Sequence, residues 1–188
     1  GAGYLIGSLP FGYLVAKANG VDIFSVGSRN PGATNVKRCV GKKAGNIVFT
    51  LDAVKGFAAT AWPILLADGS IYYQLVGLVF AVLGHSFSPF TKFRGGKGVA
   101  TMLGGVVALM VWAALVGVLV WLAVFYTSRY VSLASICLAA SLPLTNLVIG
   151  APAILTWVSL ALGAIVVARH KDNIARLLRG EENKFAKK

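Results

Sequence analysis

A basic, glycine-rich segment, residues 93–101, combines the residue types that bind an oxyanion. It reads Phe-Arg-Gly-Gly-Lys-Gly-Val-Ala-Thr and leads directly into an apolar stretch that predicts a helix. Glycines let backbone N–H groups converge on one point, and a helix that begins just after them adds unpaired N–H groups and the positive end of its dipole. Together with the charge of Lys97, the segment predicts a site for an anion such as phosphate.

The familiar nucleotide-binding motif of this composition does not fit the segment. A P-loop has a glycine six residues before its lysine and Ser or Thr directly after it, whereas Thr91 and Gly98 occupy those positions here. The segment is equally compatible with a glycine hinge whose basic residues are solvated at a membrane surface. On this segment alone, both interpretations stay open.

Composition places the chain among helical membrane proteins. Of its 188 residues, 57% are hydrophobic and 13% are charged, which is about half the charged fraction of a typical soluble domain. Long apolar runs separated by short loops predict an all-α polytopic membrane protein, and the alternating pattern of barrel strands is absent. We interpret the net charge of +12 as a topology signal rather than as a nucleic-acid-binding surface.

Cysteines and carboxylates give no sign of a disulfide or a metal. Cys39 falls in a basic loop and Cys137 in an apolar stretch, and neither lies in a metal-ligand spacing. The carboxylates are too few and too scattered for a typical metal site. We expect no metal, no cofactor and no nucleic-acid partner, and no oligomeric state is predicted.

The apolar stretches predict about seven membrane spans within a single domain over residues 1–188. The first is interpreted as a transmembrane helix rather than a removed leader, because residues that could do chemistry follow it closely. A short helix is expected in the polar stretch after it, capped by Thr34 or Asn35 and ending at Gly41. The predicted spans are residues 1–18, 46–67, 71–85, 99–110, 111–127, 129–150 and 151–168.

The distribution of Lys and Arg tests this count. When polar segments alternate between the two sides of the membrane, every Lys and Arg except Lys55 falls on one side. By the positive-inside rule that side is the cytoplasm. The N-terminus is therefore predicted outside and the C-terminus in the cytoplasm.

Four polar clusters then share the cytoplasmic face. All bring cations, and three bring glycines or hydroxyl groups near the start of a predicted helix, so together they predict an anion pocket larger than one phosphate needs. For any single cluster, contact with lipid headgroups is the more common explanation, but it explains the tight glycine turns less well. The clusters are residues 27–38, 94–98, 129–135 and 169–176.

Two histidines receive different predictions. His170 lies three residues before Asn173, on one predicted helix face, and three roles stay open for it: general base, hydrogen-bond donor to phosphate, or an interfacial histidine. His85 is expected to anchor the adjacent loop. On the last helix, Arg176 is expected to pair with Asp172.

Asp52 and Lys55 form a predicted ion pair inside a membrane span. Ionisable residues in such positions are functional candidates. We favour the simpler interpretation that the pair sets the register of the helix near its cytoplasmic end.

Four strings of the sequence resemble the motifs of the bacterial acyl-phosphate:glycerol-3-phosphate acyltransferases, the PlsY family. The match runs nearly end to end and keeps the order and spacing of the motifs, although Arg29 stands where many members have Gly. The strings are Gly-Ser-Leu-Pro-Phe-Gly (7–12), Gly-Ser-Arg-Asn-Pro-Gly-Ala-Thr-Asn (27–35), Leu-Gly-His (83–85) with the glycine-rich segment (93–101), and Arg-His-Lys-Asp-Asn-Ile-Ala-Arg-Leu (169–177).

The resemblance implies a seven-span enzyme of the bacterial inner membrane with its active site on the cytoplasmic side. It implies transfer of a fatty acyl group from acyl phosphate to the 1-hydroxyl of glycerol 3-phosphate, which gives lysophosphatidate and inorganic phosphate. Acyl phosphate, glycerol 3-phosphate and membrane lipid are then the partners. The resemblance also suggests direct attack without an acyl-enzyme, with a phosphate oxygen of the substrate accepting the proton.

The resemblance further implies a set of site residues. Arg38 and Lys97 would hold phosphate charge, and Ser28, His170 and Asn173 would orient glycerol 3-phosphate or its reacting hydroxyl. These five residues are the implied catalytic set. The implied substrate-binding residues are Asn30, Thr34, Asn35, Arg94, Gly95, Gly96, Gly98, Ser132 and Ser135.

Two other classes of protein would also carry an anion pocket in a membrane. A phosphate or organophosphate transporter would need polar residues through the whole bilayer, but here they stop in the cytoplasmic half. A non-catalytic lipid-binding protein would not need glycine-built turns. Release of phosphate by the purified protein would separate the enzyme from both.

Overall fold

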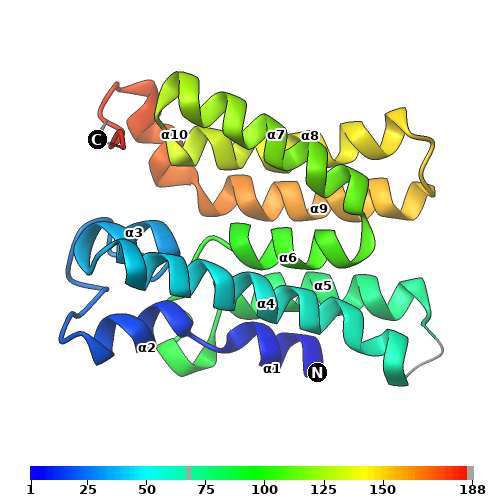
Figure 1. Cartoon of the computed structure of the whole chain (residues 1–188), viewed down its shortest axis with the longest axis horizontal. Helices are drawn as coiled ribbons and strands as arrows, with labels where there is room; N and C mark the ends of the chain where they lie inside the picture. The colour runs from blue at the N-terminus through cyan, green and yellow to red at the C-terminus, as the bar shows by residue number, and fades with distance from the viewer. Residues whose placement is uncertain (67–68, 186–188) are drawn as a thin grey trace. The chain divides into compact units, whose positions relative to one another are not determined.

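The computed structural model describes residues 1–66 and 69–185, and all regular elements in this part of the chain are helices (Figure 1). The chain divides into two compact units, Gly1–Leu109 and Met110–Lys188. The prediction of an all-helical protein is confirmed for the described residues.

The first unit is built around one long helix, α4. Helices α5 and α6 both pack on α4, and α1 packs on α5. The elements of this unit are α1 (Ala2–Ser8), α2 (Phe11–Ala18), α3 (Ala33–Cys39), α4 (Lys42–Leu66), α5 (Ile71–Ser86), the 3-10 helix η1 (Pro89–Thr91) and α6 (Val99–Leu109).

The second unit is a bundle in which α8 packs against both α7 and α9. A short helix, α10, follows α9 after a bend of 63°. The elements are α7 (Val111–Ser128), α8 (Val131–Val148), α9 (Ala153–Arg169) and α10 (Lys171–Leu178).

Four helices among the described residues, α4, α5, α7 and α8, are long and apolar enough to cross a membrane, and the bent pair α9–α10 raises this number to five. Helix α6 is apolar but has only 11 residues. The chain is therefore a polytopic membrane protein with several spans.

The first predicted span is broken into two helices, because α1 ends at Ser8 and α2 begins at Phe11, with Pro10 between them; proline has no N–H to continue a helix. One local prediction is wrong. The short third helix is capped by Gly32 rather than by Thr34 or Asn35, and it ends before Gly41. Asn35 lies inside that helix, and its side chain bonds back to the preceding loop instead of capping the helix.

Small residues set the spacing between helices in the first unit. A Cβ atom added at Gly7 would overlap the backbone of Ala81 on α5, and one added at Gly104 on α6 would overlap the backbone of Ala53 on α4. Glycine at such points lets helices approach closely, which is how helices associate where lipid provides no hydrophobic contrast.

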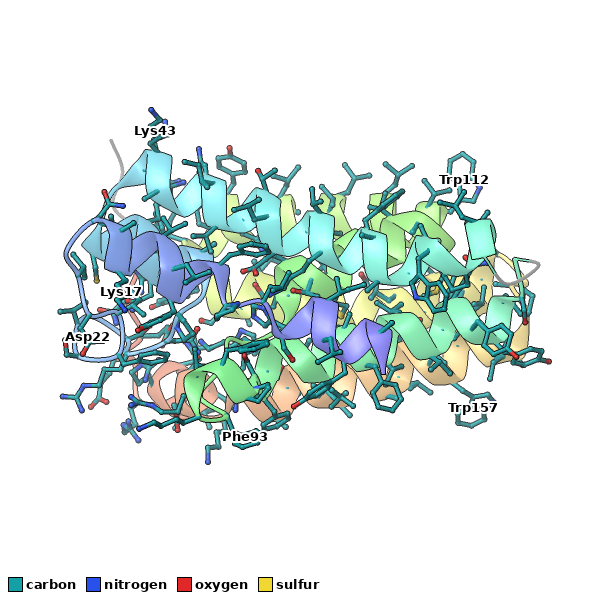
Figure 2. All side chains as sticks on the ribbon, turned by 90° about the horizontal axis from the view of Figure 1, so that it is seen from below. Lys17, Asp22, Lys43, Phe93, Trp112 and Trp157 are labelled. Carbon is teal, nitrogen blue, oxygen red and sulfur yellow. The ribbon has the colours of Figure 1, made fainter. Side chains whose placement is uncertain are left out.

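Charged and aromatic side chains gather at the ends of the units. In the first unit, Lys17, Asp22 and Lys43 lie at one end (Figure 2). In the second unit, Trp112 and Trp157 lie at the same end but on opposite sides (Figure 2), and both are 67% exposed. Tryptophan in such positions is typical of a membrane–water interface.

Candidate functional site

The loop between α2 and α3, residues 19–32, is called the first polar loop here, and Asn35 holds it in shape. The side-chain amide of Asn35 donates to the carbonyl of Val26 at 3.1 Å, and its Oδ1 accepts from the backbone N–H of Ser28 at 2.9 Å. Asn35 is buried. Its side chain therefore fixes the backbone on both sides of Gly27.

Ser28 lies at an exposed position in this loop. It is flanked by two residues with left-handed backbone, Gly27 at φ 56° and Arg29 at φ 54°. Asn30 closes the next turn, since its Oδ1 accepts from the N–H of Gly32 at 2.9 Å. The position of Ser28 is therefore set by hydrogen bonds between asparagine side chains and the loop backbone, and not by packing of its own side chain.

The segment before α6, residues 92–98, is called the glycine turn, and it packs against the end of α5. The N–H of Gly96 donates to the carbonyl of His85 at 3.1 Å. A Cβ atom at Gly95 would overlap that carbonyl, and one at Gly96 would overlap the imidazole ring. His85 therefore anchors the loop as predicted, and glycine is needed because the ring and the backbone occupy the space.

Lys97 is half-buried within the glycine turn. Gly98 follows it with φ 81°, and its carbonyl accepts the first helical hydrogen bond of α6 from Met102 at 2.7 Å. Lys97 therefore lies directly at the N-terminus of a helix, where an anion is stabilised by the helix dipole.

The first polar loop and the glycine turn are neighbours in the first unit. The guanidinium of Arg94 lies over the ring of Phe24, 4.5 Å from its centroid. A Cβ atom at Gly12, at the start of α2, would overlap the carbonyl of Pro31. The structure thus brings together two of the predicted clusters, while Thr34 and Arg38 lie on α3 directly after the loop.

His170 stands at the bend between α9 and α10 and is 3% exposed. Its Nδ1 lies 2.8 Å from the carbonyl of Val166. A carbonyl only accepts hydrogen bonds, so this contact places a proton on Nδ1, and the neutral ring then carries its lone pair on Nε2.

A carboxylate that the sequence analysis did not single out joins two predicted site residues in the second unit. Oε1 of Glu182 accepts from the hydroxyl of Ser132 at 2.9 Å and from the amide of Asn173 at 2.7 Å. Its Oε2 accepts from Nε of Arg176 at 2.8 Å. Glu182 thus ties the start of α8 to the first turn of α10 from the segment that follows α10.

The electrostatics of Glu182 follow from these contacts. Burial alone would raise the pKa of its carboxyl, but hydrogen bonds from Asn173, Ser132 and Arg176 and the charge of Arg176 hold the pKa below its ordinary value. The predicted pairing of Arg176 with Asp172 is wrong, because Arg176 reaches Glu182 instead. The adjacent pair Glu181–Glu182 in a strongly basic tail was the available sequence signal.

Ser135 lies one turn after Ser132 on α8 and is also buried. Its hydroxyl donates to the carbonyl of Val131 at 2.8 Å and accepts from Nε1 of Trp121 at 3.3 Å. The second unit therefore holds Ser132, Ser135, His170 and Asn173 at the ends of α8, α9 and α10.

Among residues 1–66 and 69–185, no group of three or more His, Cys, Asp and Glu side chains could hold a metal ion. The functional groups that the structure arranges are instead cations, hydroxyls, amides and a helix N-terminus. This chemistry suits a phosphate-bearing organic substrate.

The chain is similar over nearly its whole length to one described family of enzymes. Residues 1–180 match the family described as glycerol-3-phosphate acyltransferase. The glycerol-3-phosphate acyltransferase of Aquifex aeolicus (strain VF5) is 47% identical over 186 residues, which covers 97% of this chain and 95% of the relative. That of Endomicrobium trichonymphae is 46% identical over 183 residues, with coverage of 97% and 92%.

Solved structures agree with the sequence comparison. A crystal structure of PlsY, described as an integral membrane glycerol 3-phosphate acyltransferase in its glycerol 3-phosphate form, matches with a TM-score of 0.92 and 45% identity, covering 98% of this chain and 92% of that chain. Its lysophosphatidic acid form matches with a TM-score of 0.89 and 44% identity. The resemblance inferred from the motifs is thereby confirmed.

Proposed function

Because the chain belongs to the PlsY family of glycerol-3-phosphate acyltransferases, we propose that it transfers a fatty acyl group from acyl phosphate to the 1-hydroxyl of glycerol 3-phosphate. Acylation of glycerol 3-phosphate, a step of phospholipid synthesis, follows from the family itself. Acyl phosphate as the donor and the choice of hydroxyl are the proposal. The observation that carries it is the end-to-end match to structures in the glycerol 3-phosphate and lysophosphatidic acid forms.

The proposed reaction is a direct attack without an acyl-enzyme. The hydroxyl oxygen bonds to the carbonyl carbon of the acyl phosphate, and the bond from that carbon to the phosphate oxygen breaks. Inorganic phosphate leaves, and a substrate phosphate oxygen accepts the proton of the hydroxyl. A mixed anhydride has a good leaving group, so positioning and charge stabilisation suffice as catalysis.

The cations of the first unit would hold phosphate in this scheme. Lys97 lies at the N-terminus of α6, and Arg38 lies in the last turn of α3. The amide of Gly96 already donates to His85. The backbone of residues 95–98 is proposed as a nest for this phosphate, and within it the N–H of Gly96 is thus already engaged.

Polar side chains are proposed to orient the substrates, in the roles that the resemblance implies. Ser28, His170 and Asn173 would position glycerol 3-phosphate or its reacting hydroxyl, and Ser132 and Ser135 would face the acyl phosphate. The contacts of Glu182 with Ser132 and Asn173 support this role, because they hold both side chains in one orientation. Asn30, Thr34, Asn35 and Arg94 would contribute through the loop that they shape.

The proposed setting is the bacterial inner membrane, with seven spans, the N-terminus outside and the C-terminus in the cytoplasm. The broken helix α1–α2, the short helix α6 and the bent pair α9–α10 would complete the count beyond the four long apolar helices. The site would then open to the cytoplasm for glycerol 3-phosphate and to lipid for the acyl chain. The transporter alternative has no observation in its favour.

The deciding experiment uses purified protein incubated with acyl phosphate, with and without glycerol 3-phosphate. We expect phosphate release that requires glycerol 3-phosphate and matches the amount of lysophosphatidate formed. Release without the alcohol would instead indicate hydrolysis or an acyl-enzyme. A folded protein that releases no phosphate would contradict acyl phosphate as the donor.

A further inference from the structure

A buried cluster of charged and polar side chains in the first unit has no role in the mechanism above. Asp52 and Lys55 lie on α4 and are 2% and 4% exposed, and His85 lies near the end of α5. The cluster sits between the break that separates α1 from α2 and the glycine turn. It therefore touches two irregular pieces of backbone at once.

Lys55 stabilises the helix break. Its Nζ lies 2.8 Å from Oδ1 of Asp52 and donates to the carbonyl of Leu9 at 2.7 Å. The same ammonium lies 5.4 Å from the centroid of the Phe11 ring. The Leu9 carbonyl also accepts from the N–H of Phe11 at 3.1 Å. A carbonyl that a helix break leaves without its regular helical partner is costly in a membrane, so the additional hydrogen bond from Lys55 helps to hold the break in one geometry.

Asp52 connects the same pair to the glycine turn. Its Oδ1 lies 3.5 Å from Nδ1 of His85. His85 in turn packs its ring on Gly96 and accepts the N–H of Gly96 on its carbonyl at 3.1 Å. A chain of contacts thus runs from Leu9 through Lys55, Asp52 and His85 to the residue that precedes Lys97.

A small cavity marks the point where these pieces meet. Its volume is about 10 Å³, and its lining includes all three cluster residues together with Pro31 of the first polar loop and Gly95 of the glycine turn. The cluster therefore borders both the glycine turn, which carries Lys97, and the first polar loop, which carries Ser28.

We infer that Asp52, Lys55 and His85 are positioning residues for phosphate binding: they fix the glycine turn against the α1–α2 break, and thereby set the position of Lys97. The inference rests on the proposed role of Lys97 in binding a substrate phosphate. A buried ion pair adds little net stability compared with apolar residues of the same size. Its value here lies in fixing the geometry of two backbone segments that have no regular secondary structure.

The test is a comparison of kinetic constants for both substrates in purified variants. In Asp52→Asn the charge that aligns Lys55 and His85 is lost. In His85→Asn the ring that packs on Gly96 is lost while the Asp52–Lys55 pair stays intact, so this second variant leaves no buried charge without its partner. We expect the KM for a phosphate-bearing substrate to rise by about tenfold or more in both, with kcat changed much less.

Rescue and control variants separate positioning from general stability. Asp52→Glu restores the charge, and the adjoining cavity can take up part of the extra methylene, so its KM is expected near that of the wild type. Asn146→Ser is the stability control, because Asn146 is a buried amide of the second unit that bonds to Ser159 at 3.0 Å. It is expected to lower the melting temperature and leave both KM values unchanged.

Two failures can be told apart. If Asp52→Asn and His85→Asn melt earlier but keep wild-type KM values for both substrates, the cluster only stabilises the fold and the inference is overturned. If Lys97→Ala also keeps wild-type turnover, the proposed phosphate role of the glycine turn fails independently. A KM increase in the two cluster variants that Asp52→Glu reverses supports positioning.

Discussion

Lys97 is the residue on which the proposed phosphate site depends most. It lies between two glycines at the N-terminus of α6, so its charge and the helix dipole act on the same point. We expect Lys97→Ala to lower turnover by about 100-fold or more, the range found when one preorganised charge or donor is removed from a site. Assay of phosphate release from the purified variant measures this loss.

Lys92→Ala is a matched control for that change. Lys92 belongs to the same turn but is exposed, and the proposed mechanism gives it no role. Its turnover is expected within about twofold of the wild type. Equal losses in the two variants would show that the turn needs positive charge in general rather than Lys97 in particular.

The hydrogen bonds of Glu182 lead to a prediction about thermal stability and its dependence on pH. Its pKa is held below the ordinary value of 4.5, so the stability that its contacts provide is present above pH 4.5 and is lost as the pH falls through the lowered pKa. In Glu182→Gln the amide cannot accept all three hydrogen bonds. We expect the variant to melt about 5 °C or more below the wild type at neutral pH, with the gap closing below pH 4.5.

Thermal unfolding in detergent between neutral and acidic pH would measure that gap. Glu181→Gln is the control, because Glu181 pairs with Arg179 where both side chains are 59% exposed, and exposed pairs add little to stability. A gap that stays constant with pH would contradict the ionic role of Glu182.

The close contact between helices α4 and α6 leads to a prediction about how they pack. Helix α6 carries the glycine turn at its start and packs on α4 through Gly104, where a Cβ atom would overlap the backbone of Ala53. We expect Gly104→Ala to force the two helices apart and to lower the melting temperature by about 2–10 °C, as overpacked cores do. Activity should fall too, since the turn moves with its helix.

Gly163→Ala provides the matched comparison on α9. There the nearest atom to an added Cβ is the carbonyl oxygen of Ala139 at 3.6 Å, an ordinary contact. This variant is expected to keep both its melting temperature and its activity. If Gly104→Ala behaved in the same way, the α4–α6 contact would not control the glycine turn.

The sequence predicted most helices well because apolar length is a strong signal in a membrane protein. The predicted start of α6 at residue 99 agrees with the structure, and the predicted division between the fourth and fifth spans falls at Met110, as observed. The irregular elements were harder. Nothing in a stretch of apolar residues shows that Lys55, far along the chain, will stabilise a break at Leu9.

The candidate site was predictable to a similar degree. Motifs identified the loops, since glycine, asparagine and proline at close spacing leave few alternatives to a turn. They did not identify Glu182, which depends on a contact across 50 residues with Ser132. Contacts between residues so far apart in the sequence depend on how the helices pack, so they cannot be predicted from the spacing of residues within a motif.

The proposed membrane topology can be tested by labelling single cysteines on the two sides of the membrane. In a background with Cys39 and Cys137 replaced by serine, Ala151→Cys lies in the turn between α8 and α9, and Lys43→Cys lies at the start of α4. In the proposed topology, a membrane-impermeant maleimide added to cells with a permeabilised outer membrane should label Ala151→Cys and leave Lys43→Cys unlabelled. Lys43→Cys should react only after the inner membrane is opened.

The opposite labelling pattern would invert the proposed topology, and labelling of both sites from outside would contradict the number of spans between them. Activity of both variants in isolated membranes would show that the labelled protein is folded.

The backbone at Arg129 has a consequence for how such a chain can be both inserted and folded. Arg129 ends α7 in the left-handed region, at φ 65°, where glycine would cost least. In the proposed topology it is also one of the charges that keep this loop in the cytoplasm during insertion. Membrane topology therefore favours arginine at this position, whereas the left-handed backbone favours glycine. Glycine there would relax the finished helix end and weaken the signal that orients the nascent chain, so insertion, rather than the folded state, would explain why an arginine stands at this helix end.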